Sequence, residues 1–322
     1  MSHAMRHIPR VSRSIQSVLR GGAAGALALG AAALAACQAG KQALRADFAD
    51  YNAILQQNQS EQMLLNLVRM HYREVPYFMK AGSLTASYET TVSGGADATL
   101  QQGDQSLVGV SGNYTLSSKP TVSYTPVEGK EFVQQLMEEI SPETFAMLLR
   151  AGWSARLLGD LVVERVMLDG GAELIGRPNS PSFAKFREFM ESIEEAEEAD
   201  RLKVVSRKDG GYDLEFDGKT VGVERFQLRS LYSAMFMASR DVETPETLKG
   251  ETKPSAAIGE MRIRASQKPT VGALVSVEYR GWHYSIAADD IRSKDTLALF
   301  MQLSRIQAGP PTAPPTLTIP AR

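Results

Sequence analysis

Four acidic residues have the spacing of a calcium-binding loop. Asp213, Glu215, Asp217 and Glu224 fall at ligand positions of that loop, with Gly218 where it turns sharply. At these spacings, carboxylate oxygens would surround one cation. The loop requires a helix on each side, however, and here the flanking residues alternate as they do in strands. We therefore interpret Asp217-Gly218 as a hairpin turn and predict neither a metal nor a cofactor.

A serine and a lysine have the Ser-x-x-Lys spacing of penicillin-interacting enzymes, in which the lysine assists a serine nucleophile. These residues are Ser182 and Lys185. The companion motifs Ser-Asp-Asn and Lys-Thr-Gly do not occur in the sequence, and a helix N-cap also explains Ser182. An envelope hydrolase that uses Ser182 and Lys185, or an acidic cluster such as Asp289 and Asp290, is one function to test. We assign no catalytic residue.

Histidine and cysteine are scarce, which limits the available chemistry. Beyond residue 36 the histidines are His71 and His283, and Cys37 is the one cysteine of the chain. A zinc site of His and Cys ligands is therefore disfavoured, and a Ser-His-Asp triad would have to use one of these two histidines. The sequence favours a protein that is not an enzyme.

Period-two patterns set one region apart from the rest of the chain. Residues 81–125 are rich in Ser, Thr and Gly, and their alternation predicts an antiparallel hairpin followed by a third strand over 121–124. A meander of strands over 202–206, 212–216 and 220–224 is also predicted. Further strands are expected over 261–265 and 274–286, the latter with a turn at Gly281.

Helical spacing of apolar residues predicts the remaining elements. Residues 157–168 fit either a helix or a buried strand. The other segments are 42–57, a helix capped by Ser60, 129–140, a helix begun by Ser141 and Pro142, 182–200, 226–239 and 296–306. Together the patterns indicate an α+β fold of antiparallel hairpins and meanders packed with amphipathic helices. The predicted body is 37–308, followed by a proline-rich tail over 309–322.

The first 36 residues have the features of a secretory signal. Four arginines and no acidic residue precede an apolar run from Gly21 to Ala33. The segment Leu34-Ala35-Ala36-Cys37 then resembles the lipobox of bacterial lipoproteins. That resemblance implies cleavage before Cys37 and attachment of lipid, including palmitate, to its thiol. Because Gln38 follows instead of aspartate, it also implies an outer-membrane location, with the body facing the periplasm.

The charge balance disfavours nucleic acid as a partner. The chain carries 35 basic and 37 acidic residues, and the four leader arginines leave the remainder more acidic than the formal net charge of −2. We expect attachment to the membrane through the lipid and a protein or polymer partner in the envelope. Candidate contact residues are aromatic: Tyr77, Tyr88, Tyr114, Tyr124, Trp282 and Tyr284.

Several segments of the sequence together carry a resemblance to a known family. They are Glu61–Arg69 with Pro76–Phe78, Pro120–Gly129 with Phe132, Tyr279–Ile286, the residues Asp290, Ser293, Lys294 and Thr296, and Leu317–Pro320. Through them the chain resembles a family of uncharacterised proteobacterial outer-membrane lipoproteins over nearly all of the mature length. The resemblance implies a single unit and brings no activity with it.

Two non-enzymatic functions therefore remain open. The first is a lipid-anchored envelope protein with a structural or interaction role. The second is an oligomer that contributes the hairpins of 81–125 to a pore or to a secretion or export complex in the outer membrane. Strands of about 9–11 residues cross a bilayer, and those expected here are long enough. Neither face of the hairpin, however, looks strongly apolar along the sequence.

Overall fold

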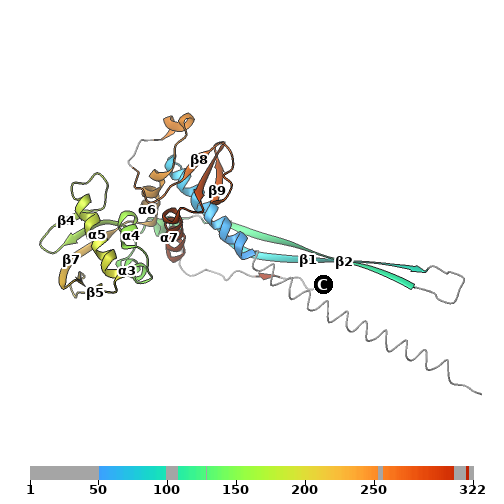
Figure 1. Ribbon diagram of the computed structural model, residues 1–322, viewed down its shortest axis with the longest axis horizontal. Helices are drawn as coiled ribbons and strands as arrows, with labels where there is room; N and C mark the ends of the chain where they lie inside the picture. Colours follow the sequence, from blue (N-terminus) through green and yellow to red (C-terminus); the bar gives the residue numbers. More distant parts are fainter. Residues whose placement is uncertain (1–50, 99–107, 128, 253–256, 308–316, 319–322) are drawn as a thin grey trace, which may run out of the picture. The chain divides into compact units, whose positions relative to one another are not determined.

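The computed structural model describes residues 51–98, 108–127, 129–252, 257–307 and 317–318 (Figure 1). Contacts divide the chain after Gln57. Of the first part, residues 51–57 are described, and they are helical. The second part holds all the other elements. They confirm the predicted α+β class, with helices and antiparallel sheets both well represented.

The second part begins with a helix over 58–71, which carries no label in Figure 1. The remaining helices are α2 (Lys130–Met137), α3 (Pro142–Arg150), α4 (Ala155–Leu161), α5 (Phe183–Glu198), α6 (Leu231–Ala238) and α7 (Ile291–Gln307), with short 3-10 helices η1 (Ser239–Asp241) and η2 (Glu246–Glu251). In the described residues, no helix is both long and apolar enough to span a membrane.

The strands form three separate sheets. The largest has the order β4-β3-β7-β6-β5, and its neighbours are all antiparallel. Its strands are β3 (Val163–Leu168), β4 (Glu173–Ile175), β5 (Lys203–Ser206), β6 (Tyr212–Phe216) and β7 (Lys219–Leu228). A second sheet has the order β8-β10-β9, from β8 (Arg264–Ser266), β9 (Ala273–Tyr279) and β10 (Trp282–Ala287). The third consists of β1 (Met79–Ala98), β2 (Val108–Pro126) and the short β11 (Leu317–Thr318).

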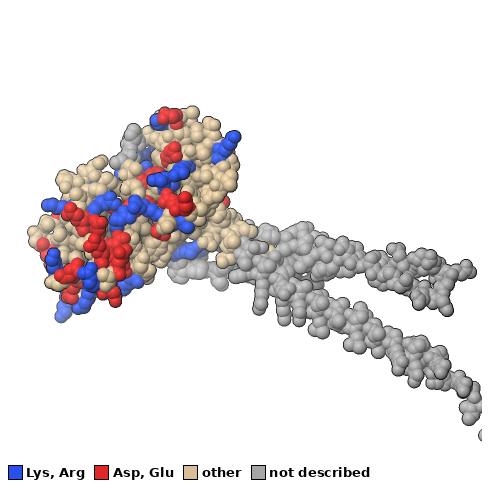
Figure 2. All heavy atoms as spheres, in the orientation of Figure 1, with Lys and Arg blue, Asp and Glu red and all other residues tan. Residues whose placement is uncertain are grey.

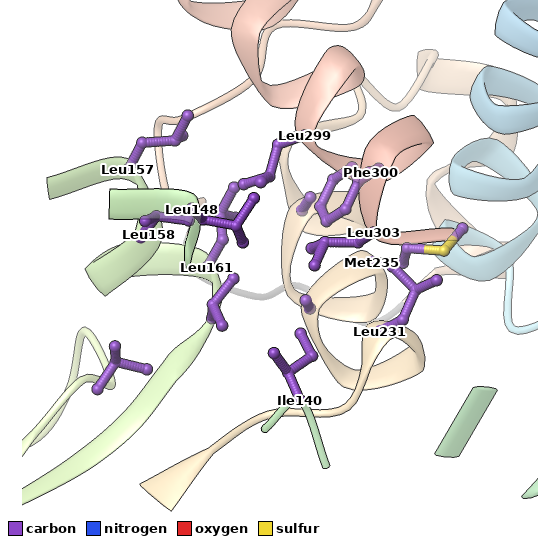
Figure 3. Packing of buried hydrophobic residues seen from close by; sticks show 14 of the residues in the cluster. Ile140, Leu148, Leu157, Leu158, Leu161, Leu231, Met235, Leu299, Phe300 and Leu303 are labelled. Carbon is purple, nitrogen blue, oxygen red and sulfur yellow. The ribbon is translucent and has the colours of Figure 1, made fainter. Parts of the chain in front are cut away.

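One hydrophobic core joins the helices to the five-stranded sheet and to the β8-β10-β9 sheet. Figure 3 shows leucines of α3 and α4, among them Leu148 and Leu161, facing Phe300 and Leu303 of α7 and Met235 of α6. All of these side chains are buried. Because the core draws on segments from residue 63 to residue 303, α3 through α7 depend on one another for burial of their apolar faces.

Two predicted turns are confirmed. Asp217 and Gly218 both have positive φ, 52° and 71°, and link the register pair Phe216 and Lys219. Arg280 and Gly281, with φ of 51° and 76°, link β9 to β10 in the same way. Positive φ at both central residues is characteristic of the type I′ turn, whose twist matches that of the flanking strands. Glycine adopts a positive φ without strain.

The predicted helix cap at Ser141 is confirmed, and the one at Ser60 is wrong. Ser141 begins α3 as predicted, and its Oγ accepts the N–H of Thr144 at 3.1 Å. Ser60, however, does not begin a helix, because the residues on both sides of it are helical. Its hydroxyl instead donates to the sulfur of Met301 on α7 at 3.5 Å.

Other element boundaries also differ from the predicted ones. Residues 157–168 contain both structures that were open, because α4 ends at Leu161 and β3 starts at Val163. The strand predicted to end at 224 continues to Leu228, so helix α6 starts only after its cap, Ser230. The strand expected from Met261 begins at Arg264, and the predicted third strand over 121–124 is the end of β2. The leader lies outside the described residues, as does the tail apart from β11.

Candidate functional site

Side-chain amides of the 58–71 helix hold the base of the β1–β2 hairpin. Asn66 is fully buried, donates to the carbonyl of Tyr77 at 3.0 Å and accepts the N–H of the same residue at 2.9 Å. Gln62 lies one turn earlier. Oriented as its partners require, its amide donates to the carbonyl of Met79 at 3.2 Å and accepts the N–H of Met79 at 2.7 Å. These two side chains thus satisfy the backbone N–H and carbonyl groups of Tyr77 and Met79, where the chain enters β1.

The two strands leave the core together. The N–H of Val127 donates to the carbonyl of Phe78 at 2.9 Å, immediately beside the first register pair, Met79 and Pro126. Phe78 is buried, and its ring contacts that of Phe132 with centroids 5.4 Å apart. Beyond this point β1 and β2 run side by side as an antiparallel ladder to Ala98 and Val108, with one register shift between Ala81 and Leu84 (Figure 1).

The register sorts the hairpin residues into two sets. In an antiparallel ladder, directly opposite residues lie on the same face, and successive residues of a strand lie on opposite faces. One set, which we call the apolar face, comprises Leu84, Ala86, Tyr88, Thr90, Val92, Gly94, Ala96 and Ala98, opposite Val122, Pro120, Ser118, Leu116, Tyr114, Gly112, Val110 and Val108. The polar face comprises Thr85, Ser87, Glu89, Thr91, Ser93, Gly95 and Asp97, opposite Thr121, Lys119, Ser117, Thr115, Asn113, Ser111 and Gly109.

The expectation that neither face is strongly apolar is therefore wrong for this register. Apart from Thr90 and Ser118, the apolar face contains only apolar residues, glycine, proline and tyrosine, whereas the polar face contains no hydrophobic residue. Each strand already alternates on its own. The pairing then places the apolar half of each strand on the same face of the hairpin.

The outer edges of the hairpin have little strand pairing of their own. In the described residues, β11 pairs in parallel with β1 at Leu84 and Thr85, and no other strand joins β1 or β2. Pro120 lies within β2, opposite Ala86. Because proline lacks an N–H group, this position cannot donate to a neighbouring strand. At the other described positions, and apart from β11, the outer edges are open to pairing with another strand.

The structure does not assemble the four acids of the calcium-loop pattern into a cation site. Asp213 and Glu215 lie on β6, where they meet Arg207 at 3.4 Å and Lys203 at 3.0 Å. Asp217 pairs with Arg201, and Glu224 is exposed on β7. In the described part of the chain, no group of three or more His, Cys, Asp and Glu side chains could hold a metal ion.

The predicted hydrolase residues are held in other contacts. Ser182 precedes α5 but does not cap it, since its Oγ accepts the N–H of Ile175 at 3.0 Å. Lys185 is exposed, and no hydrogen bond between described atoms joins it to Ser182. Asp290 caps α7 by accepting the N–H of Ser293 at 3.2 Å, and Asp289 is exposed.

The two histidines lie on different elements. His71 is at the end of the 58–71 helix, between the carbonyl of Ser239 at 2.9 Å and the hydroxyl of Thr244 at 2.7 Å. Burial lowers the pKa of His71, opposed by the hydrogen bond to Ser239. His283 lies on β10, opposite Glu278 and Ser266. Neither histidine is hydrogen-bonded to a carboxylate in the described contacts, so neither is arranged as a triad base.

The aromatic candidates separate into three groups. Tyr77 and Tyr124 are exposed near the hairpin base, where Asn58 donates to the hydroxyl of Tyr124 at 2.6 Å. Tyr88 and Tyr114 belong to the apolar face by their register. Tyr284 is fully buried and Trp282 is partly buried, so Tyr284 is a core residue and not a surface contact. Cys37 lies outside the described residues.

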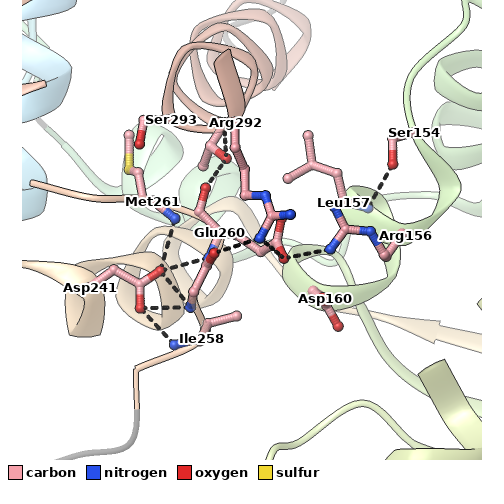
Figure 4. Close-up of polar contacts among 12 residues, drawn as sticks. Ser154, Arg156, Leu157, Asp160, Asp241, Ile258, Glu260, Met261, Arg292 and Ser293 are labelled. Atoms are coloured by element: carbon pink, nitrogen blue, oxygen red, sulfur yellow. Dashed lines mark hydrogen bonds and ion pairs between the residues drawn. The ribbon is translucent and has the colours of Figure 1, made fainter. Parts of the chain in front are cut away.

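A buried group of charged side chains, which the sequence analysis did not identify, links α4, α5 and α7 (Figure 4). Glu260, 1% exposed, accepts from Arg156 at 3.2 Å and lies 4.0 Å from Arg292. Asp160, 3% exposed, accepts from Arg187 at 2.8 Å. Burial raises the pKa of both carboxyls, opposed by these arginines. Because both carboxyls are enclosed by protein, we interpret the group as a structural link and not as a reaction centre.

Charge on the surface does not define a site either. Figure 2 shows acidic side chains gathered in a strip over the region of α5, bordered by basic side chains, with the two signs interspersed elsewhere on the visible described face. Comparisons with protein-family models, with curated proteins and with solved structures found no match. The candidate site is therefore the β1–β2 hairpin, defined by its two faces and its open edges.

Proposed function

We propose that this chain is an outer-membrane lipoprotein that assembles with copies of itself through the β1–β2 hairpin. In this assembly β1 of one copy pairs with β2 of the next, and the hairpins together close into a ring. The apolar face contacts lipid, and the polar face lines a passage of the kind that a pore or a secretion or export complex requires. The bodies, held by acylated Cys37, surround one end of the ring.

The observation that carries this proposal is the combination of length, register and open edges. An isolated two-stranded hairpin is marginally stable in water. The β1–β2 ladder extends to Ala98 with only β11 beside it at Leu84 and Thr85. Pairing with neighbouring copies would satisfy the backbone groups of both edges, which a bilayer requires of any spanning strand. The apolar face, from Leu84 to Ala98, exceeds the roughly 9–11 residues that cross a bilayer.

Cross-linking between chains tests this arrangement directly. Thr91→Cys in β1 and Thr115→Cys in β2 would be introduced into two differently tagged full-length chains that are expressed together. Disulfide-linked hetero-dimers in membranes, and a defined oligomer after extraction in detergent, are expected. A scan of neighbouring β1 positions allows for the unknown register between copies. A matched pair with Lys185→Cys, on exposed α5, should give no such dimer.

The outcome that contradicts the proposal is a monomer in the membrane extract with no cross-link at any scanned position. The lipid anchor has its own test, because Cys37→Ser removes the acceptor thiol. Metabolic labelling with palmitate should mark the wild-type protein and not this variant. Labelling of both would contradict lipidation at Cys37 without deciding the role of the hairpin.

A further inference from the structure

A cavity of about 360 Å³ lies between the large sheet and α6, apart from the hairpin. Glu164 of β3 lines it, together with Arg177 and Asn179 of the loop between β4 and α5. Arg229, Phe236 of α6 and Arg240 of η1 complete the principal lining. Pockets of roughly 300–1,000 Å³ hold small molecules in other proteins, so the volume suits a small ligand.

Arg229 brings a buried positive charge to this cavity. Its side chain is 5% exposed and donates to the backbone carbonyls of Asp160, at 3.2 Å, and Gly176. A guanidinium has more N–H donors than these two bonds use. Among the described residues no carboxylate forms an ion pair with it. Burial, together with the nearby charges of Arg177 and Arg240, lowers the pKa of Arg229 to about 10, while Glu164 and Asp160 oppose this shift.

The other charges of the cavity do not balance that of Arg229. Arg177 pairs with Glu164 at the rim. Arg240 lies with its guanidinium carbon 5.9 Å from the centre of the Phe236 ring, and no carboxylate in the described part of the chain pairs with it. Three arginines therefore meet one glutamate around the cavity, beside an aromatic ring and Met237.

We propose that this cavity binds a small organic oxyanion, a carboxylate or phosphate, whose apolar part packs against Phe236. Arginine presents a planar fork of donors that matches the oxygens of both groups, and a desolvated arginine gains most from such a partner. Asn179 can add a neutral donor at the rim. The proposal concerns the body of the protein and does not depend on assembly of the hairpins.

Titration calorimetry on the full-length protein in detergent tests it with defined probes: inorganic phosphate, phenyl phosphate and benzoate. We expect phenyl phosphate or benzoate to bind more tightly than inorganic phosphate. Arg240→Gln should weaken that binding by about tenfold, as expected for loss of a charged donor. Arg225→Gln, which removes an exposed arginine of β7 outside the cavity, is the matched control and should leave the affinity unchanged.

A second variant keeps the test independent of folding defects. Glu164→Gln removes the one carboxylate that competes for Arg177, so it should bind phenyl phosphate several-fold more tightly than the wild type. Absence of binding by all three probes, or equal weakening by Arg240→Gln and Arg225→Gln, would overturn the proposal. Competition by phosphatidylglycerol vesicles, and not by phosphatidylcholine vesicles, would identify a lipid headgroup as the source of the oxyanion. Without competition, the source is a soluble compound.

Discussion

The hydroxyl oxygens of Tyr72 and Tyr284 lie 2.6 Å apart in the core, although 212 residues separate them in sequence. Tyr284 is fully buried on β10, and Tyr72 follows the 58–71 helix, so this hydrogen bond fastens the small sheet to that helix. Arg280 lies over the ring of Tyr72, 5.3 Å from its centre. The hydroxyl groups of two buried amphipathic side chains thus satisfy each other.

This pair can be measured by a double-mutant cycle. Tyr284→Phe leaves the Tyr72 hydroxyl buried without its partner and should lower the free energy of unfolding by about 1–2 kcal/mol. Tyr72→Phe should cost a similar amount. The double variant should cost less than the two single changes together, because it leaves no unpaired hydroxyl. Urea unfolding curves of all four proteins give the values, and strict additivity would contradict a direct interaction.

Asn66 is expected to be the most sensitive polar residue near the hairpin base. Asn66→Leu removes both hydrogen bonds between this buried amide and the backbone of Tyr77, so the free energy of unfolding should fall by about 2–4 kcal/mol. Hydrogen exchange of the Tyr77 amide should accelerate at the same time. Asn58→Leu, on the same helix, loses only an exposed bond to Tyr124 and should change stability by less than about 0.5 kcal/mol. Similar losses in both variants would contradict this role for Asn66.

Stability should fall in mild acid because of His71. The pKa of this residue is lowered in the folded protein, so the unfolded chain binds a proton first as the pH falls. The stabilising contribution is complete above about pH 6.5, the ordinary histidine pKa, and declines as the pH falls towards the lowered value. His71→Gln should be free of this decline between about pH 7 and pH 5. His283→Gln retains His71 and should decline like the wild type; equal slopes in all three proteins would contradict the prediction.

The two faces of the hairpin should respond differently to the same charge. Val92→Lys places a lysine on the apolar face, where a charge facing lipid costs about 2–4 kcal/mol per copy near the bilayer centre. Oligomers in detergent extracts should then be lost. Ser93→Lys adds the same charge to the polar face, one residue away, and should retain them. Native mass spectrometry of both extracts decides, and loss of oligomers in both variants or in neither would contradict the assignment of faces.

Local signals predicted much of the secondary structure, including the cap at Ser141 and the turns at Asp217-Gly218 and Gly281. Their errors came from interactions distant in sequence. Ser60 was interpreted as a cap because Ser commonly begins helices, yet its partner is Met301. The sequence predicts a separate third strand over 121–124, yet pairing with β1 keeps β2 extended through Pro120 to Pro126. Propensity alone cannot reveal either partner.

The candidate sites, too, could be predicted from the sequence only where local patterns determine them. The alternation in 81–125 was visible, but only the register joins the apolar halves of both strands on one face. The cavity was not predicted, because Glu164, Arg177, Arg229 and Arg240 come from four separate elements and share no motif. A lone arginine after a strand, such as Arg229, gives no sequence signal that its charge will be buried without a carboxylate.

The bond between Val127 and Phe78 makes the hairpin an insertion in the body, since the chain returns to the point from which it left. The hairpin can therefore vary in length during evolution without disturbing the core. Adding or removing two residues in each strand preserves the alternation of faces and changes the reach by roughly 7 Å. A relative adapted to a thicker or thinner envelope would need only matched insertions near the tip. Unmatched insertions of one residue would exchange the faces and should be selected against.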